Sequence, residues 1–78
     1  MMKIEVYAIL KDYFDKQFVV KEQIEDVNTL KEYLSKQKPD AKDILRSCRF
    51  AVDDEFVSDT YQLKENDSIS IIPPSSGG

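Results

Sequence analysis

The 78-residue sequence contains no histidine and a single cysteine, Cys48. Without histidine there is no imidazole to move protons near pH 7, and one cysteine cannot complete a Cys/His metal site or an internal disulfide. A Ser/His or Cys/His nucleophile pair is excluded for the same reason. Any chemistry of this chain must therefore use carboxylates, a lysine, the backbone or the chain termini, and we expect it to bind no metal or cofactor.

Long apolar runs are also missing, since no stretch approaches the roughly 20 residues that a transmembrane helix needs. Near the N-terminus, Glu5 interrupts the apolar segment that a signal peptide requires. The lone cysteine agrees with a reducing compartment, so we expect a cytoplasmic protein without a membrane partner. The chain has 11 basic and 15 acidic residues, and the basic ones are scattered, which disfavours nucleic acid as a partner.

The length allows one small domain, and a content of 41% hydrophobic and 33% charged residues is typical of a globular protein. Residues Lys3 to Leu10 alternate between two faces, which predicts a strand. Residues 11–15 are expected to form a turn or a single helical turn. Strand formers in Gln17 to Glu22 then predict a second strand that pairs with the first in a hairpin.

The main helix is predicted over residues 27–37. Asp26 can cap its first turn, and Val27, Leu30 and Leu34 follow at helical spacing. An alternative start at Thr29, with Glu32 completing a capping box, would leave Val27 off the apolar stripe. Pro39 should end the helix.

A second, short helix is expected after Pro39, capped by Asp40 and carrying Ala41, Ile44 and Leu45. Arg49 to Val52 and Glu55 to Val57 are expected to form a hairpin around a turn at Asp53-Asp54, and residues 68–72 the last strand. This order of elements predicts an α+β fold, in which a mixed sheet of four or five strands is covered on one face by the main helix.

The last six residues, Pro73-Pro74-Ser75-Ser76-Gly77-Gly78, differ in composition from residues 1–72, which form the predicted domain. The two prolines remove amide donors, so residues 73–78 should leave the sheet as an extended, flexible tail. Six residues at polyproline spacing reach roughly 20 Å, far enough to enter a partner's pocket.

Both glycines of the protein are its last two residues, Gly77 and Gly78. Glycine lets a chain enter a narrow channel and leaves the terminal carbonyl open to attack, because no Cβ blocks the approach. The ionised α-carboxylate is a poor electrophile and needs activation, for example as an acyl adenylate made with ATP. The tail composition is also that of a linker or a frayed terminus.

The chain resembles the small, sulfur-carrying subunit of molybdopterin synthase, a ubiquitin-like β-grasp protein, over essentially its whole length. The resemblance lies in residues 49–57, in residues 63–72 and above all in the tail from Pro73 to Gly78. The sequence departs from the family pattern at Asp53, where asparagine is usual, and at Asn66, where glycine is usual. Asparagine tolerates the left-handed turn conformation, so the second departure is compatible with the fold.

The resemblance implies a mechanism in which the chain itself is a non-catalytic carrier. An E1-like enzyme would use ATP to adenylate Gly78, and a sulfur donor protein would convert the adenylate to a thiocarboxylate. Residues Pro73, Pro74, Ser75, Ser76 and Gly77 would thread the tail into the large synthase subunit, where sulfur passes to a pterin precursor. A heterotetramer of two small and two large subunits is implied. The alternatives are a carrier for thiazole synthesis, which typically lacks the two prolines, and a ubiquitin-like modifier or binding module.

Three other candidates remain outside the tail. Ile72 is expected to be exposed, because it falls on the face opposite Ile69 and Ile71, and the resemblance places a partner contact there. Cys48 could carry a persulfide, but a lone cysteine is more often a packing residue. The acidic turn at residues 53–55 lacks the ligand spacing of a calcium loop, so we expect no metal site there.

Overall fold

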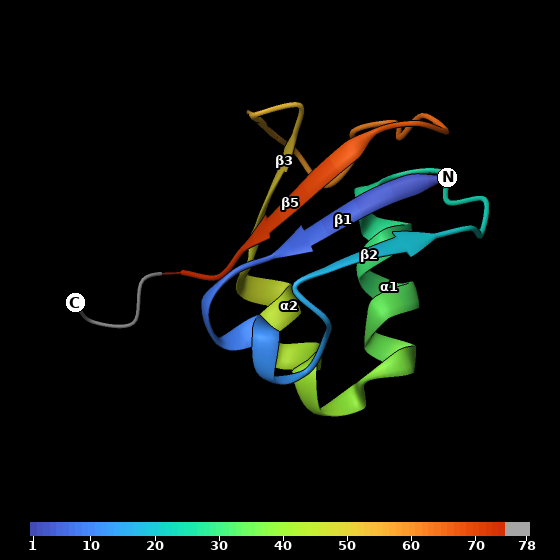
Figure 1. The fold of residues 1–78 in the computed structure, drawn as a ribbon. Coiled ribbons are helices and arrows are strands. Elements are labelled where there is room, and N and C mark those ends of the chain that lie inside the picture. Colours follow the sequence, from blue (N-terminus) through green and yellow to red (C-terminus); the bar gives the residue numbers. More distant parts are fainter. Residues whose placement is uncertain (75–78) are drawn as a thin grey trace.

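The computed structural model describes residues 1–74. In chain order its elements are β1 (Met2–Val6), the 3-10 helix η1 (Ala8–Asp12), β2 (Gln17–Val20), α1 (Val27–Gln37), the 3-10 helix η2 (Pro39–Ala41), α2 (Lys42–Ser47), β3 (Arg49–Val52), β4 (Glu55–Val57) and β5 (Ser68–Ile72). The five strands form one sheet in the order β2-β1-β5-β3-β4, with α1 and α2 on one face (Figure 1). This confirms the predicted ubiquitin-like β-grasp fold.

The centre of the sheet is the parallel pair β1 and β5, in which Ile4 lies opposite Ile69 and Val6 opposite Ile71. The other pairings, β1 with β2, β3 with β4 and β3 with β5, are antiparallel. Because β1 and β5 run in the same direction, their C-terminal ends lie at the same edge of the sheet. The tail therefore begins at this edge, next to the end of β1.

Helix α1 has the predicted bounds and the predicted cap. The Asp26 carboxylate accepts hydrogen bonds from the Thr29 amide at 2.8 Å and from the Thr29 hydroxyl at 2.7 Å. The first bond satisfies an amide that has no partner inside the helix, and both bonds lower the pKa of Asp26. The alternative start at Thr29 is thereby excluded.

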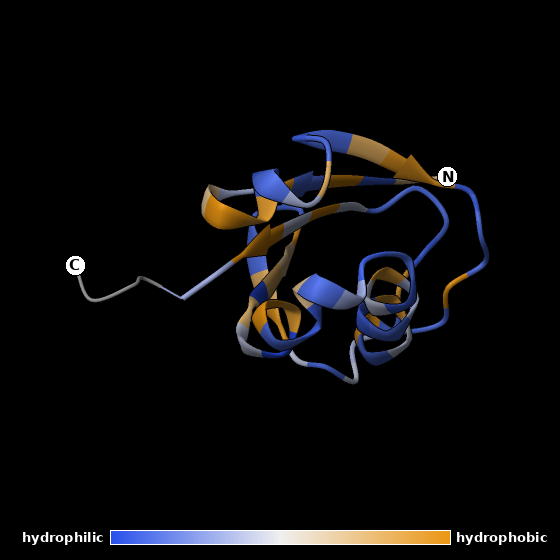
Figure 2. Cartoon of the chain, turned by 90° about the horizontal axis from the view of Figure 1, so that it is seen from below, coloured by the Kyte–Doolittle hydropathy of each residue, from blue (hydrophilic) through white to orange (hydrophobic). Residues whose placement is uncertain are grey.

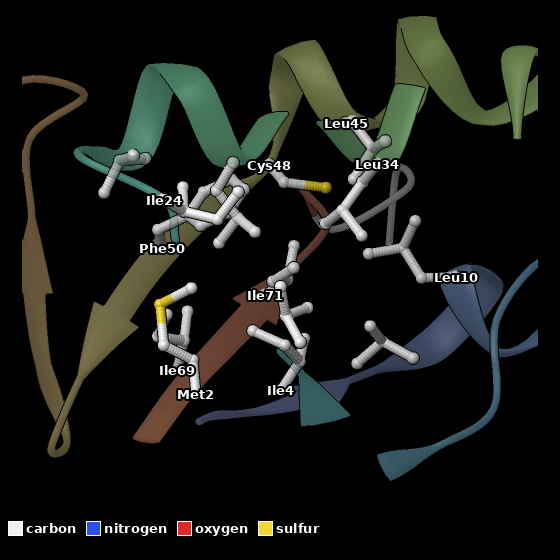
Figure 3. Packing of buried hydrophobic residues seen from close by; sticks show 14 of the residues in the cluster. Met2, Ile4, Leu10, Ile24, Leu34, Leu45, Cys48, Phe50, Ile69 and Ile71 are labelled. Carbon is white, nitrogen blue, oxygen red and sulfur yellow. The ribbon is translucent and has the colours of Figure 1, made fainter. Parts of the chain in front are cut away.

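Apolar side chains from both layers meet in one core (Figure 3). Val27, Leu30 and Leu34 of α1 are fully buried, as predicted from their spacing. In β1 and β5 every second residue faces the core, so apolar and polar positions alternate along these strands (Figure 2), whereas residues 50–52 of β3 are all apolar and buried. The strand residues buried in the core are Met2, Ile4, Val6, Val20, Phe50, Val52, Ile69 and Ile71.

Two predicted strands are shorter than expected, since β1 ends at Val6 rather than Leu10 and β2 at Val20 rather than Glu22. After Tyr7 the chain turns at Ala8, whose φ of 55° is incompatible with a strand, into η1. Leu10 is still buried, because one side of η1 faces the core. Tyr7, Ala8 and Ile9 are all exposed and only Leu10 is buried, so neither the backbone nor the burial of residues 7–10 follows the strand that their alternating pattern predicts.

The region after α1 also corrects one prediction. Asp40 was expected to cap the second helix, but it lies inside η2, and α2 begins after Ala41 without a side-chain cap. Pro39, whose fixed φ suits the start of a helical turn, begins η2 instead. The hairpin of β3 and β4 has the predicted turn, with Asp53 and Asp54 both at positive φ, as a tight two-residue hairpin turn requires.

Candidate functional site

The tail starts at the end of β5, the middle strand of the sheet. Ile72 is the last paired residue and lies opposite Arg49 of β3. Pro73 follows, half-buried, and Pro74 is exposed, leading away from the body of the domain (Figure 1). Since neither proline has an amide to donate, the strand cannot continue, as the sequence predicts. Ser75, Ser76, Gly77 and Gly78, the predicted threading and reactive residues, lie outside the described residues.

Ile72 itself is half-buried, so the prediction that it is exposed is only partly right. Its side chain belongs to the uncovered face of the sheet, opposite Ile69 and Ile71, as the alternation requires. Because β5 lies between β1 and β3, side chains of these two strands on the uncovered face reduce the exposure of Ile72. Ile72 therefore lies within a larger surface.

Exposed apolar side chains lie around Ile72, where the tail starts. Of the five large apolar side chains that are exposed within residues 1–74, three lie near the start of the tail: Tyr7 (38% exposed), Ile9 (50%) and Phe56 (54%). Tyr7 directly follows Val6, which pairs with Ile71, so Tyr7 comes level with Ile72. The turn at Ala8 then places Ile9 in η1, just after the C-terminal end of β1, the strand that pairs with β5.

On the other side of Ile72, Arg49 links the strand to Phe56. The guanidinium carbon of Arg49 lies 3.8 Å from the centroid of the Phe56 ring, a stacked cation–π contact. Phe56 is also paired with Ala51, the next residue of β3 on the uncovered face. We call the set Tyr7, Ile9, Arg49, Phe56 and Ile72 the tail-root surface.

The sequence analysis identified Ile72 alone from this set. Tyr7 and Ile9 belong to the alternating residues 3–10, and this alternation gives no reason to connect them with the tail. Arg49 and Phe56 lie in the segment 49–57 that carries the family resemblance, but the resemblance implied no partner contact for them. The missing information was the order of the strands, since these residues come to one edge only through the pairings of β1 with β5, β3 with β5 and β3 with β4.

Cys48 has the environment of a packing residue. It is buried, and its Sγ donates to the carbonyl oxygen of Ile44 at 3.0 Å. Burial raises the pKa of the Cys48 thiol to about 11, although the charge of Lys31 acts in the opposite direction. The thiol is therefore protonated at neutral pH and is a poor nucleophile.

Within residues 1–74, no three ligand-type side chains come close enough together to hold a metal ion. In the same part of the chain, none of the helices has both the length and the apolar character needed to cross a membrane.

Solved structures with the same fold cover nearly the whole chain. SAMP1 from Haloferax volcanii superposes with a TM-score of 0.81 at 16% identity, over 99% of this chain and 98% of that one. Subunit 1 of the molybdopterin converting factor from Pyrococcus furiosus gives 0.79 at 19% identity, over 94% and 95%. At these identities the two matches establish the fold alone.

A third structure is a complex of subunits 1 and 2 of the molybdopterin-converting factor from Helicobacter pylori. The match has 26% identity and a TM-score of 0.69, over 99% of this chain and 97% of that one. The model of the ThiS family matches residues 4–78, which includes the Gly-Gly end. The chain therefore belongs to the ThiS family of small ubiquitin-like proteins and has the role of a sulfur carrier or a ubiquitin-like modifier.

Proposed function

We propose that this protein is the sulfur-carrying small subunit of a molybdopterin synthase. The observation that carries the proposal is the position of the tail, which leaves the central strand β5 at an edge where Tyr7, Ile9 and Phe56 are exposed. A partner that covers these side chains would receive the tail at the same time. The similarity to a chain from a complex of two converting-factor subunits supports such a partner.

The chemistry takes place at the α-carboxylate of Gly78. Its oxygen attacks the α-phosphorus of ATP in an E1-like enzyme, which forms an acyl adenylate and releases pyrophosphate. A persulfide on a donor protein attacks the acyl carbon and displaces AMP. Reduction of the resulting acyl disulfide by a thiol then leaves the thiocarboxylate on Gly78. Inside the large subunit, the thiocarboxylate sulfur attacks a carbon of the pterin precursor and displaces an oxygen substituent from it. Water then hydrolyses the resulting thioester, which leaves the sulfur on the pterin and returns Gly78 to its carboxylate.

The side chains of the domain agree with a carrier that leaves catalysis to its partner enzymes. The chain has no histidine, and the one thiol, Cys48, is buried and protonated at neutral pH. Proton transfer and activation therefore fall to the partner enzymes, while this chain supplies the reactive end and the surface that guides it. A small domain with an extended end can serve two enzymes in turn, because only the tail has to enter each active site.

Reconstitution with a choice of acceptors tests the proposal. The protein is loaded with sulfur by an activating enzyme, ATP and a sulfur donor, and is then divided between the large synthase subunit with the pterin precursor and a thiazole synthase with its substrates. We expect loss of the thiocarboxylate and formation of molybdopterin in the first reaction only. Turnover in the thiazole reaction alone, or covalent attachment of the chain to lysines of other proteins, would contradict the assignment.

A further inference from the structure

A groove of about 640 Å³ runs between α1 and α2, on the helical side of the domain. Its cations come from both helices: Lys31 and Lys36 from α1, and Lys42 and Arg46 from α2. Lys42 and Arg46 are four residues apart, one turn of the helix, so they lie on the same side of α2. Pro39 of η2 closes one end of the groove. We call this the basic groove.

The basic groove has a charge opposite to that of the rest of the molecule. It contains four of the 11 basic residues and one of the 15 acidic residues, Glu32, which gives it a net charge of +3. The remaining residues include seven basic and fourteen acidic ones, with a net charge of −7. A chain with this balance would be expected to surround each lysine with carboxylates. The concentration of positive charge in one groove is therefore a specific feature of this fold.

Most of this positive charge is not neutralised inside the domain. Across residues 1–74 the only ion pair within 4.0 Å joins Lys31 to Asp59, at 2.9 Å. Lys31 is also held against the ring of Phe50, with its Nζ 5.4 Å from the ring centroid. Lys36, Lys42 and Arg46 are exposed and have no such partner among those residues. These three cations are therefore available to a ligand.

We propose that the basic groove binds an acidic segment of a partner protein. The α1 side of the groove extends from Asn28 to Lys36, about 12 Å at the helical rise, which matches an extended segment of about four residues. The cations are distributed along two helices, which suits several carboxylates in a row better than a single phosphate. The acidic remainder of the surface would repel a long polyanion such as nucleic acid.

This contact would leave the tail free. The basic groove lies on the helices that cover one face of the sheet, whereas Ile72 and Phe56 belong to the uncovered face (Figure 1). A partner can therefore hold the domain by its helices while the tail-root surface is covered by another protein. The inference goes beyond the proposed function, because it depends on neither Gly78 nor the sulfur chemistry.

The test is an NMR titration of the uniformly ¹⁵N-labelled full chain with acetylated hexaglutamate at low ionic strength. We expect saturable shift changes in the amides of α1, η2 and α2 around the groove, weakened by added salt. The double variant Lys42→Gln/Arg46→Gln should bind about fivefold to tenfold more weakly, since each exposed charge pair contributes little by itself. The control, Lys21→Gln/Lys64→Gln, removes the same charge from a different part of the surface and should change affinity less than twofold.

Several outcomes would overturn the proposal. Shift changes scattered over all lysines, or an equal loss in the control variant, would mean unspecific attraction. Tighter binding of inorganic phosphate or of hexathymidylate at matched ionic strength would assign the groove to a small anion or a nucleic acid. Concentration-dependent shifts at the groove without peptide would indicate a second copy of the chain as the occupant. Absence of any groove shift at millimolar peptide would also reject the proposal.

Discussion

Ile72 and Arg49 lie opposite each other in the last ladder position before the tail, and the Arg49 guanidinium stacks on Phe56 at 3.8 Å. The tail therefore starts directly from the central strand β5, and Arg49, the ladder partner of its last residue, is held by a cation–π contact with Phe56. Pro73 and Pro74 follow directly after Ile72. A partner that recognises the tail-root surface would therefore find Pro73 and Pro74, the first residues of the tail, next to it.

The first prediction tests the packing of α1 on the sheet. Leu30 is fully buried beneath the helix, so Leu30→Ala should lower the free energy of unfolding by about 2 to 5 kcal/mol through lost burial and a residual cavity. Gln37→Ala, at an exposed position at the end of the same helix, is the control and should change it by less than about 0.5 kcal/mol. Urea denaturation measures both. Equal midpoints for the two variants would reject the assigned helix face.

The second prediction concerns pH and the helix cap. The bonds from Thr29 hold the pKa of Asp26 below its usual 3.8, so the carboxylate adds stability above that pH, which is lost as the pH falls through the lower folded value. Asp26→Asn keeps an acceptor at the cap but does not titrate there. Relative to this variant, the parent should therefore lose stability between pH 5 and pH 2. Urea denaturation at each pH measures the free energy of unfolding of both proteins. If this free energy changed with pH equally in the parent and in Asp26→Asn, the assigned role of the carboxylate would be contradicted.

The third prediction tests the tail-root surface. Ile72→Asp and, separately, Ile9→Asp should weaken binding to the large synthase subunit at least about tenfold, because each removes an apolar contact and adds a charge that must be desolvated. Val19→Asp is the control, since Val19 is 47% exposed, close to the 50% of Ile9, but lies on the edge strand β2 opposite Lys3. Titration calorimetry gives the affinities and thermal melts check the folds. Similar losses at Ile9 and Val19 would refute the location of the interface.

The fourth prediction separates Cys48 from the sulfur chemistry. With a pKa of about 11, less than about 1% of the thiol is ionised at pH 8. Iodoacetamide should therefore modify the folded protein far more slowly than the protein in urea. Cys48→Ala should retain full sulfur transfer once its fold is verified. Loss of transfer in this variant, with an unchanged melt, would show that the thiol takes part.

Much of the fold could be predicted from the sequence where local signals agree. The bounds of α1 follow from a cap at Asp26, an apolar stripe and Pro39, which all point to the same helix. The end of β1 was missed because the apolar alternation of residues 7–10 is compatible with a strand, whereas the backbone turns at Ala8. A strand and a 3-10 helix can both bury Leu10, so the apolar pattern of the sequence does not determine the φ and ψ of these residues.

For the candidate site, the sequence identified the tail but not its surroundings. Glycines at an end and two prolines before them form a local pattern that can be read along the chain. Tyr7, Phe56 and Ile72 are far apart in sequence and meet only through the strand order β1-β5-β3-β4. Such a surface depends on long-range pairing, for which single residues give no signal.

The central claim is that Gly78 carries the sulfur, and the intact mass of the protein tests it most directly. After incubation with the activating enzyme, ATP and a sulfur donor, the parent should gain about 16 Da, as sulfur replaces one oxygen, and fragmentation should locate the gain on Gly78. A chain lacking Gly78, or extended by one residue, shifts the carboxylate by about 3.3 Å and should gain nothing while melting like the parent. A full 16 Da gain on the extended chain without processing, or an unchanged parent under conditions that load another carrier, would contradict the account.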